Sequence, residues 1–180
     1  YSGISVGYSA LFQPEEGIRH LKKALTYFES TGDRFHTAAA YNNLGTNLIL
    51  NGEWQKAEEI LDRAVELGSE IDHVHLSTFL STRGELSLVR GDYQAAEKLF
   101  NQAVDAAAKE TQEWYSVQIS YFLAKCYLRQ DRIDDAIAQA RLAVERCAQI
   151  KENFHRLRAA TVIAEALIIF ISLYGLEMPL

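Results

Sequence analysis

Proline is almost absent from this chain of 180 residues, which contains only Pro14 and Pro179. An internal proline removes a helical hydrogen bond and clashes with the preceding turn, so its scarcity permits long uninterrupted helices. Cysteine is equally rare, and Cys126 and Cys147 form neither a CxxC pair nor a metal-finger spacing. This excludes a disulfide scaffold and indicates a reducing compartment. No Asn-x-Ser/Thr sequon points to secretion, and we therefore expect a cytoplasmic protein.

An excess of positive charge is also missing. The chain has 18 basic and 24 acidic residues, a formal net charge of −6. General nucleic-acid binders obtain most of their affinity by neutralising phosphates, which this balance does not favour. Glycine-rich phosphate loops of the GxGxxG and GxxxxGK[ST] types do not occur. The sequence therefore predicts neither nucleic-acid binding nor a nucleotide cofactor.

Clusters of catalytic or metal-binding residue types are lacking as well. His73 and His75 form the one HxH pair, without a cysteine or carboxylate at metal-ligand spacing. Neither cysteine has the histidine partner that a nucleophile needs. The longest apolar run, residues 162–176, contains Glu165 and is shorter than the roughly 20 residues of a membrane span. We expect no enzyme activity, no cofactor, no metal and no membrane segment.

What the sequence does contain is an internal repeat. The stretch at 43–68 (NLGTNLILNGEWQKAEEILDRAVELG) aligns without a gap with the stretch at 82–107 (TRGELSLVRGDYQAAEKLFNQAVDAA), so that Gly45 matches Gly84. A third copy at 122–147 follows after nearly the same interval, and weaker copies precede and follow these three. The matched positions are glycines, aromatics and alanines. Such self-similarity is typical of proteins built by stacking one structural unit.

Each unit reads as two helices joined by a tight turn at Gly52, Gly91 or Asp131. Glycine or alanine on the first helix would face alanine on the second, because larger side chains would hold the backbones apart. Replacing Gly45 by leucine should therefore overpack this contact, at a cost of roughly 1–3 kcal/mol. The predicted fold is an all-α solenoid of about nine helices. Its units are residues 1–33, 34–72, 73–111 and 112–151, with a half-unit at 152–176.

These features together resemble the tetratricopeptide repeat family over about nine-tenths of the chain. The resemblance rests on the Leu44–Gly45 pair, on the turn glycine followed by an aromatic residue (Gly52 and Trp54), and on two alanines in each second helix. Arg83 and Ser87 depart from it, because leucines stand at their places one unit earlier. The units are longer than the common unit of about 34 residues. They are similar to those of sensor domains in signal-transduction ATPases related to the maltose-regulon activator, pheromone receptors, kinesin light chains and polarity adaptors.

The resemblance implies a right-handed superhelix whose first helices line a concave groove for a peptide or a partner segment. An asparagine matching Asn43 binds the peptide backbone in several family members, since a carboxamide offers both donors and an acceptor. Tyr121 and Phe122 would be apolar anchors in this groove. Two further readings stay open: that these residues form only a solvated surface, or that the groove binds a small effector. The expected groove residues are Asn42, Asn43, Thr46, Thr78, Ser81, Thr82, Glu85, Gln118, Tyr121, Phe122, Lys125, Arg129 and Arg158.

The chemistry of the partner is predicted from charge. Eight basic and five acidic residues lie between Lys125 and Arg158, a positive end in an acidic chain. We expect an acidic partner segment to bind towards this end, although a mixed solvated surface is an equally good reading. A clamp for a terminal carboxylate is not expected, because Thr78, Ser81 and Thr82 stand where it needs basic residues.

The apolar run at residues 162–176 suggests a second role. It begins as the first helix of a fifth unit, but no second helix follows to cover Ile168, Ile169 and Phe170. Three explanations compete: truncation before the next unit, self-association of two copies, or burial by the tail around Met178. We expect a fragment of a larger regulator, with a sensor or adaptor function and pairing through this helix. The alternative is an oligomerisation scaffold in which the groove is incidental.

Overall fold

The computed structural model describes residues 13–71, 75–108, 113–149, 160–162 and 165. Across these residues, regular structure is helical throughout and includes seven helices of 14 to 18 residues. The predicted all-α solenoid is confirmed. The remainder of the expected nine helices falls outside the described residues. The chain divides into two compact parts, residues 1–91 and residues 92–180, which are described in turn.

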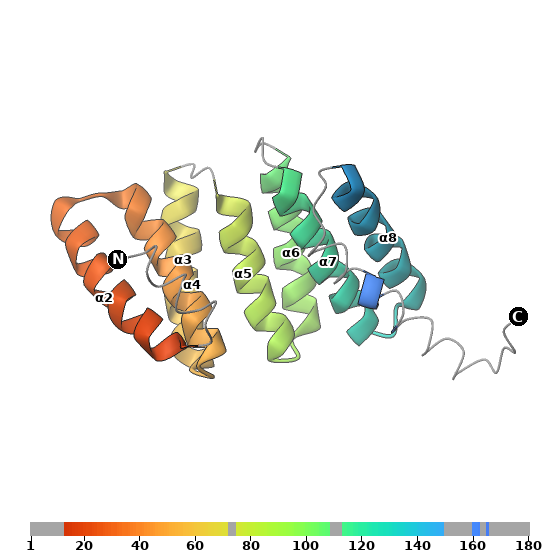
Figure 1. The fold of residues 1–180 in the computed structure, drawn as a ribbon, viewed down its shortest axis with the longest axis horizontal. Helices are drawn as coiled ribbons and strands as arrows, with labels where there is room; N and C mark the ends of the chain where they lie inside the picture. Colours follow the sequence, from red (N-terminus) through yellow and green to blue (C-terminus); the bar gives the residue numbers. More distant parts are fainter. Residues whose placement is uncertain (1–12, 72–74, 109–112, 150–159, 163–164, 166–180) are drawn as a thin grey trace, which may run out of the picture. The chain divides into compact units, whose positions relative to one another are not determined.

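The first part contains four helices, which lie side by side in Figure 1. They are α2 (Pro14–Thr31), α3 (Arg34–Leu50), α4 (Trp54–Glu70) and α5 (Leu76–Val89). The α3 helix packs against both α2 and α4, and α5 packs against α4 and also against α3. The two first helices of successive units, α3 and α5, are thus direct neighbours.

The second part repeats this arrangement with three helices. They are α6 (Tyr93–Ala107), α7 (Glu113–Arg129) and α8 (Ile133–Gln149). The α7 helix packs against both α6 and α8. None of the described helices in either part combines the length and the hydropathy that crossing a bilayer requires.

The second helix of each unit buries the same stripe of small and apolar side chains. In α4 the buried residues follow one another at intervals of four, three and four, which keeps them on one face of a helix. The equivalent positions of the next unit are buried in α6. The first three of them are also buried at the equivalent positions of the preceding unit, in α2. The stripe of α4 is Ala57, Leu61, Ala64 and Gly68, and that of α6 is Ala96, Phe100, Ala103 and Ala107.

The turns between the helices of a unit lie where the sequence predicts them. Gly52 adopts a φ of +77° between α3 and α4, in the left-handed region that glycine tolerates best. Its amide donates to the carbonyl of Ile49, and the next amide donates to Leu48, which closes the end of α3. Between α7 and α8 this place is taken by Asp131, with a φ of +58°. Aspartate is among the few other residues that enter this region readily.

Gly45 accounts for the close approach of α3 and α4. A Cβ atom built on Gly45 would lie 2.4 Å from Cγ and from Cδ2 of Leu61. Leu61 is fully buried, together with Leu44 and Leu48 in one apolar cluster. The predicted close approach at Gly45 is therefore confirmed, but the residue that faces it is Leu61 and not an alanine of α4.

Arg83 and Ser87, the two departures from the repeat pattern, interact with each other. The Arg83 guanidinium donates to Oγ of Ser87 at 3.0 Å and forms ion pairs of 2.6 Å with Glu58 and with Asp62 of α4. Arg90 also pairs with Glu58. A largely buried guanidinium, with 15% of its side chain exposed, thus replaces the leucine contact of the preceding unit.

Candidate partner-binding surface

The accessible part of the predicted groove in the first half of the chain is a polar row on α3 and α5. Asn43 and Thr82 occupy equivalent positions in successive units, and both are partly exposed. Thr46 and Glu85 form a second equivalent pair one turn further along, and both are also partly exposed. The helices α3 and α5 are neighbours. We call these four residues, Asn43, Thr46, Thr82 and Glu85, the polar row.

The hydrogen bonds of these side chains leave Asn43 available to a partner. The hydroxyl groups of Thr46 and Thr82 donate to the carbonyls of Asn42 and Thr78, each four residues earlier in its own helix. By contrast, no hydrogen bond within the described part of the chain engages the carboxamide of Asn43. Its two donors and its acceptor are therefore free to pair with a polar ligand.

Asn42 and Ser81 lie deeper than predicted. They occupy equivalent positions on α3 and α5 and are only 6% and 2% exposed. The prediction that they face solvent in the groove is therefore wrong, because both side chains are buried. Asn42 Oδ1, Thr78 Oγ1 and Ser81 Oγ are nevertheless buried without a hydrogen-bond partner among the described residues. Leaving a buried polar atom unpaired costs about 1–3 kcal/mol, so this strip beneath the polar row is not optimised for stability alone.

Tyr121 and Phe122 are also buried, with 6% and 3% of their surface exposed. The Phe122 ring stacks on Phe100 of α6, with the ring centres 5.7 Å apart and the planes within 4°. Lys125 Nζ lies over the Tyr121 ring, 5.7 Å from its centre. The prediction that Tyr121 and Phe122 anchor a peptide at the surface is therefore wrong, because both rings belong to the core of the second part of the chain.

The basic end of the predicted surface survives in part on α7. Lys125 and Arg129 are one helical turn apart, the former partly exposed and the latter exposed, while Gln118 on the same helix is partly exposed. Within the described residues, neither Lys125 nor Arg129 forms an ion pair with a carboxylate. Their charges are thus available to an acidic partner. Arg158, Ile168, Ile169 and Phe170, predicted for the groove and for self-association, lie outside the described residues.

Chemically reactive groups are few in the part of the chain that the structure describes. No group of three or more histidine, cysteine, aspartate or glutamate side chains gathers there in an arrangement that could hold a metal ion. Cys126 is buried, and this burial raises the pKa of its thiol, which disfavours the reactive thiolate. Its sulfur lies 3.3 Å from the carbonyl oxygen of Tyr93, as expected of a packing residue.

Several solved structures have a fold similar to that of this chain. A kinesin light chain-like repeat protein from Podosopora anserina is 20% identical, with a TM-score of 0.72 over 92% of this chain and 82% of that one. A signal transduction ATPase with a tetratricopeptide repeat sensor, from Pyrococcus horikoshii, is 18% identical, with a TM-score of 0.76 over 93% of this chain and 26% of that one. A Rap protein in complex with competence and sporulation factor is 20% identical, with a TM-score of 0.62 over 96% and 51%.

The sequence was compared with curated proteins and with models of protein families. No curated protein matches the sequence. The tetratricopeptide repeat family, however, matches residues 1–70 and 36–109 in one of its forms and residues 81–149 in another. These matches span the helix pairs and the turns described above. The chain therefore belongs to the tetratricopeptide repeat family, whose arrays are protein–protein interaction modules.

Proposed function

We propose that this chain binds an extended segment of a partner protein along the polar row of α3 and α5. The module has no enzyme activity of its own and acts as the sensor or adaptor part of a larger cytoplasmic regulator. The observation that carries the proposal is the free, partly exposed carboxamide of Asn43 on α3, with the equivalent Thr82 also partly exposed on the neighbouring helix α5.

The spacing of the helices suits an extended peptide. Axes of packed helices lie about 8–10 Å apart, and an extended chain advances about 3.3 Å per residue. Asn43 and Thr82 would therefore contact main-chain groups about three residues apart in a peptide crossing both helices. Side chains that bind the main chain select for extended conformation rather than for sequence.

The relatives favour the same role. The Rap protein was solved with competence and sporulation factor bound, and the repeats of the signal transduction ATPase are described as its sensor. Both are fold-level likenesses at 20% identity or less, so they support the class of function and leave the partner open.

The charge of α7, in the second part of the chain, suggests a separate preference of this helix for acidic segments. Lys125 and Arg129 present two cations one turn apart without ion-pair partners in the described part of the chain. We expect acidic segments to be preferred, because carboxylates would replace water around these two groups. An array of peptides that differ only in acidic content tests this expectation. Equal binding of acidic and neutral peptides would remove the preference and leave the groove proposal intact.

Substitution of Asn43 tests the proposed function directly. A peptide library is screened for ligands, and the Kd of the best ligand is then measured for the Asn43→Ala variant. Losing one hydrogen bond of about 1 kcal/mol should weaken binding about fivefold. Gln55→Ala is the matched control, because Gln55 is an exposed carboxamide on α4, a second helix. Equal losses for the two variants, or no ligand in the library, would contradict the proposal.

A further inference from the structure

Accessible residues recur at equivalent positions along the first helices α3 and α5. In both helices they follow one another at intervals of four, three and four, which keeps them on one face of the helix. Most of the residues between them are buried. The polar row is therefore the middle of a longer accessible stripe. The stripe of α3 is Ala39, Asn43, Thr46 and Leu50, and that of α5 is Thr78, Thr82, Glu85 and Val89.

The stripe changes from polar to aliphatic where each helix ends. Leu50 is the last residue of α3, and Val89 is the last residue of α5. Their exposed fractions are 52% and 48%, so neither side chain is used by the packing of the fold. Both helices end at the lower edge of the first part in Figure 1. We call Leu50 and Val89 the apolar end of the polar row.

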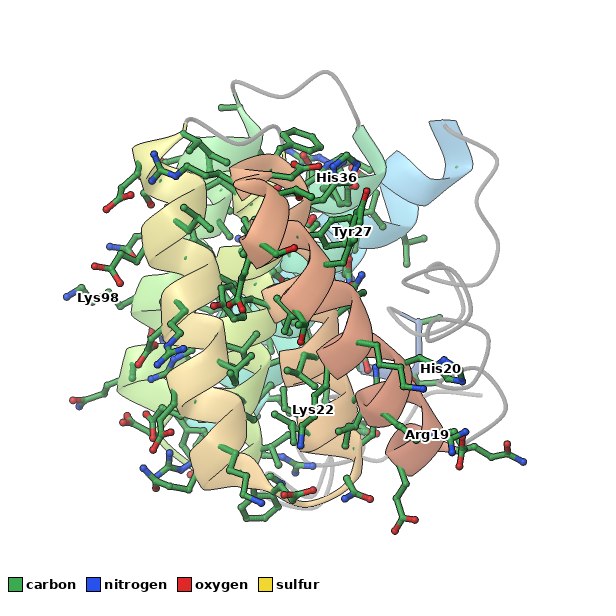
Figure 2. All side chains as sticks on the ribbon, turned by 90° about the vertical axis from the view of Figure 1, so that its left-hand side faces the viewer. Arg19, His20, Lys22, Tyr27, His36 and Lys98 are labelled. Atoms are coloured by element: carbon green, nitrogen blue, oxygen red, sulfur yellow. The ribbon has the colours of Figure 1, made fainter. Side chains whose placement is uncertain are left out.

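Recurrence distinguishes the apolar end from the other exposed apolar residues. Single exposed apolar residues are common on protein surfaces and need no explanation. Leu50 and Val89, however, occupy equivalent positions of two units, which none of the other exposed large apolar residues of the described chain do. Figure 2 shows Tyr27 near the end of α2 that lies opposite Arg19, on the side of His36, where α3 begins rather than ends. The other four are Tyr27, Phe35, Trp54 and Val104.

A hollow of about 410 Å³ lies between the turn that follows α3 and the end of α5. It is lined by Gly52 and Trp54, which come shortly after Leu50 in the chain, and by Arg90, which comes directly after Val89. The Trp54 ring is 43% exposed and adds apolar surface here. The two residues of the apolar end thus stand at the edges of one recess that has room for a bulky side chain.

The charges around this hollow favour an uncharged occupant. Each charged residue that lines it already has a partner of opposite charge: Arg90 pairs with Glu58, and Lys56 pairs with Glu53. Hydrogen bonds from Arg90 and Lys56 lower the pKa of Glu58 and Glu53, so both carboxyls stay ionised at neutral pH and both pairs persist. A charged side chain of a partner would have to break one of these pairs, whereas an apolar side chain would not.

We propose that the apolar end selects a bulky apolar side chain in the partner segment that the polar row binds. The inference rests on the proposed function and adds sequence specificity to it, because main-chain contacts alone do not distinguish one sequence from another. Leu50 lies one turn beyond Thr46 on the same face, about 6 Å along the helix. Leucine, methionine or phenylalanine can span this distance from a main chain that lies on the polar row. The occupant is thus an extended segment with one such residue.

The probe is the tightest peptide from the library screen, measured by fluorescence anisotropy with the full chain, together with a version in which its bulky apolar residue is alanine. Leu50→Ala combined with Val89→Ala should raise the Kd of the original peptide about three- to tenfold. The same double variant should leave the Kd of the alanine peptide nearly unchanged, since the contact is already missing. Both positions are exposed, so the fold should be kept. Val104→Ala, at an exposed valine of α6, is the matched control and should bind both peptides as the unchanged protein does.

Asn43→Ala separates this inference from the proposed function, because it should weaken binding of both peptides alike. If Asn43→Ala weakens binding and the double variant does not, the apolar end is not part of the site and the proposed function stands alone. A tightest peptide without a bulky apolar residue would also overturn the inference. So would a dimer in sedimentation that the double variant dissociates, because the occupant would then be a second copy of the chain. If no peptide binds, both proposals fail.

Discussion

Replacing Gly45 by alanine tests how tightly the two helices of a unit must approach. The added methyl group would lie 2.4 Å from two atoms of Leu61, well inside contact distance. Leu61 is fully buried and cannot turn into solvent. Alanine gains about 1 kcal/mol over glycine in helix propensity, while overpacking of a core costs roughly 1–3 kcal/mol. We therefore expect Gly45→Ala to destabilise the protein by about 1 kcal/mol despite its better propensity.

Urea unfolding followed by circular dichroism measures this change, and a double-mutant cycle with Leu61→Ala identifies its cause. Leu61→Ala alone should cost about 2–5 kcal/mol, because it leaves a cavity. In the double variant the new methyl group enters this cavity, so the combined loss should fall short of the sum by about 1 kcal/mol or more. Additive effects, or a Gly45→Ala protein more stable than the original, would refute the packing argument.

Three further predictions concern helix ends and ion pairs. Asp92→Ala should destabilise α6 by about 0.5–2 kcal/mol in urea unfolding, because Asp92 accepts a hydrogen bond from the first turn of this helix. Arg90 lowers the pKa of Glu58, with Arg83 assisting, so this pairing should stabilise the fold above pH 4.5 and be lost as the pH falls through the lowered pKa. Glu58→Gln should flatten this part of the stability profile. Arg83→Leu should lower the free energy of unfolding by about 1–2 kcal/mol. Arg34→Leu breaks an exposed ion pair and should lower it by less than about 1 kcal/mol. An Arg83→Leu protein that is more stable than the original would contradict this reasoning.

The second helices could be predicted almost completely from the sequence. Their buried stripe of small and apolar residues recurs once in every unit, from Leu21 in α2 to Leu61 in α4 and Phe100 in α6. One face of such a helix meets its own first helix, and this contact repeats in every unit. A repeated contact leaves a repeated pattern, which is why periodicity alone located the helices and the turns.

The first helices were harder to predict, and α3, for example, packs against three helices, α2, α4 and α5. Their buried residues follow no single stripe: in α3 they include Ala40, Asn42, Leu44 and Asn47. A polar residue at such a position reads as solvent-facing when only its own unit is considered. Asn42 and Ser81 are buried all the same, and the residues of a single unit do not reveal this burial. The same reasoning explains Phe122, whose stacking partner Phe100 belongs to the preceding unit.

Arg83 shows how a departure from the repeat can keep a helix contact while changing its chemistry. A lone leucine-to-arginine change at a packing position would bury a charge without a partner, which costs several kcal/mol. Here the leucine that would stand at position 87 is a serine that accepts from Arg83, and α4 supplies Glu58 and Asp62. The two departures are therefore one substitution in physical terms, an apolar contact replaced by a hydrogen-bonded ion pair. This replacement keeps α5 attached to α4 while the neighbouring polar row of α3 and α5 stays exposed, which is the arrangement that partner binding requires.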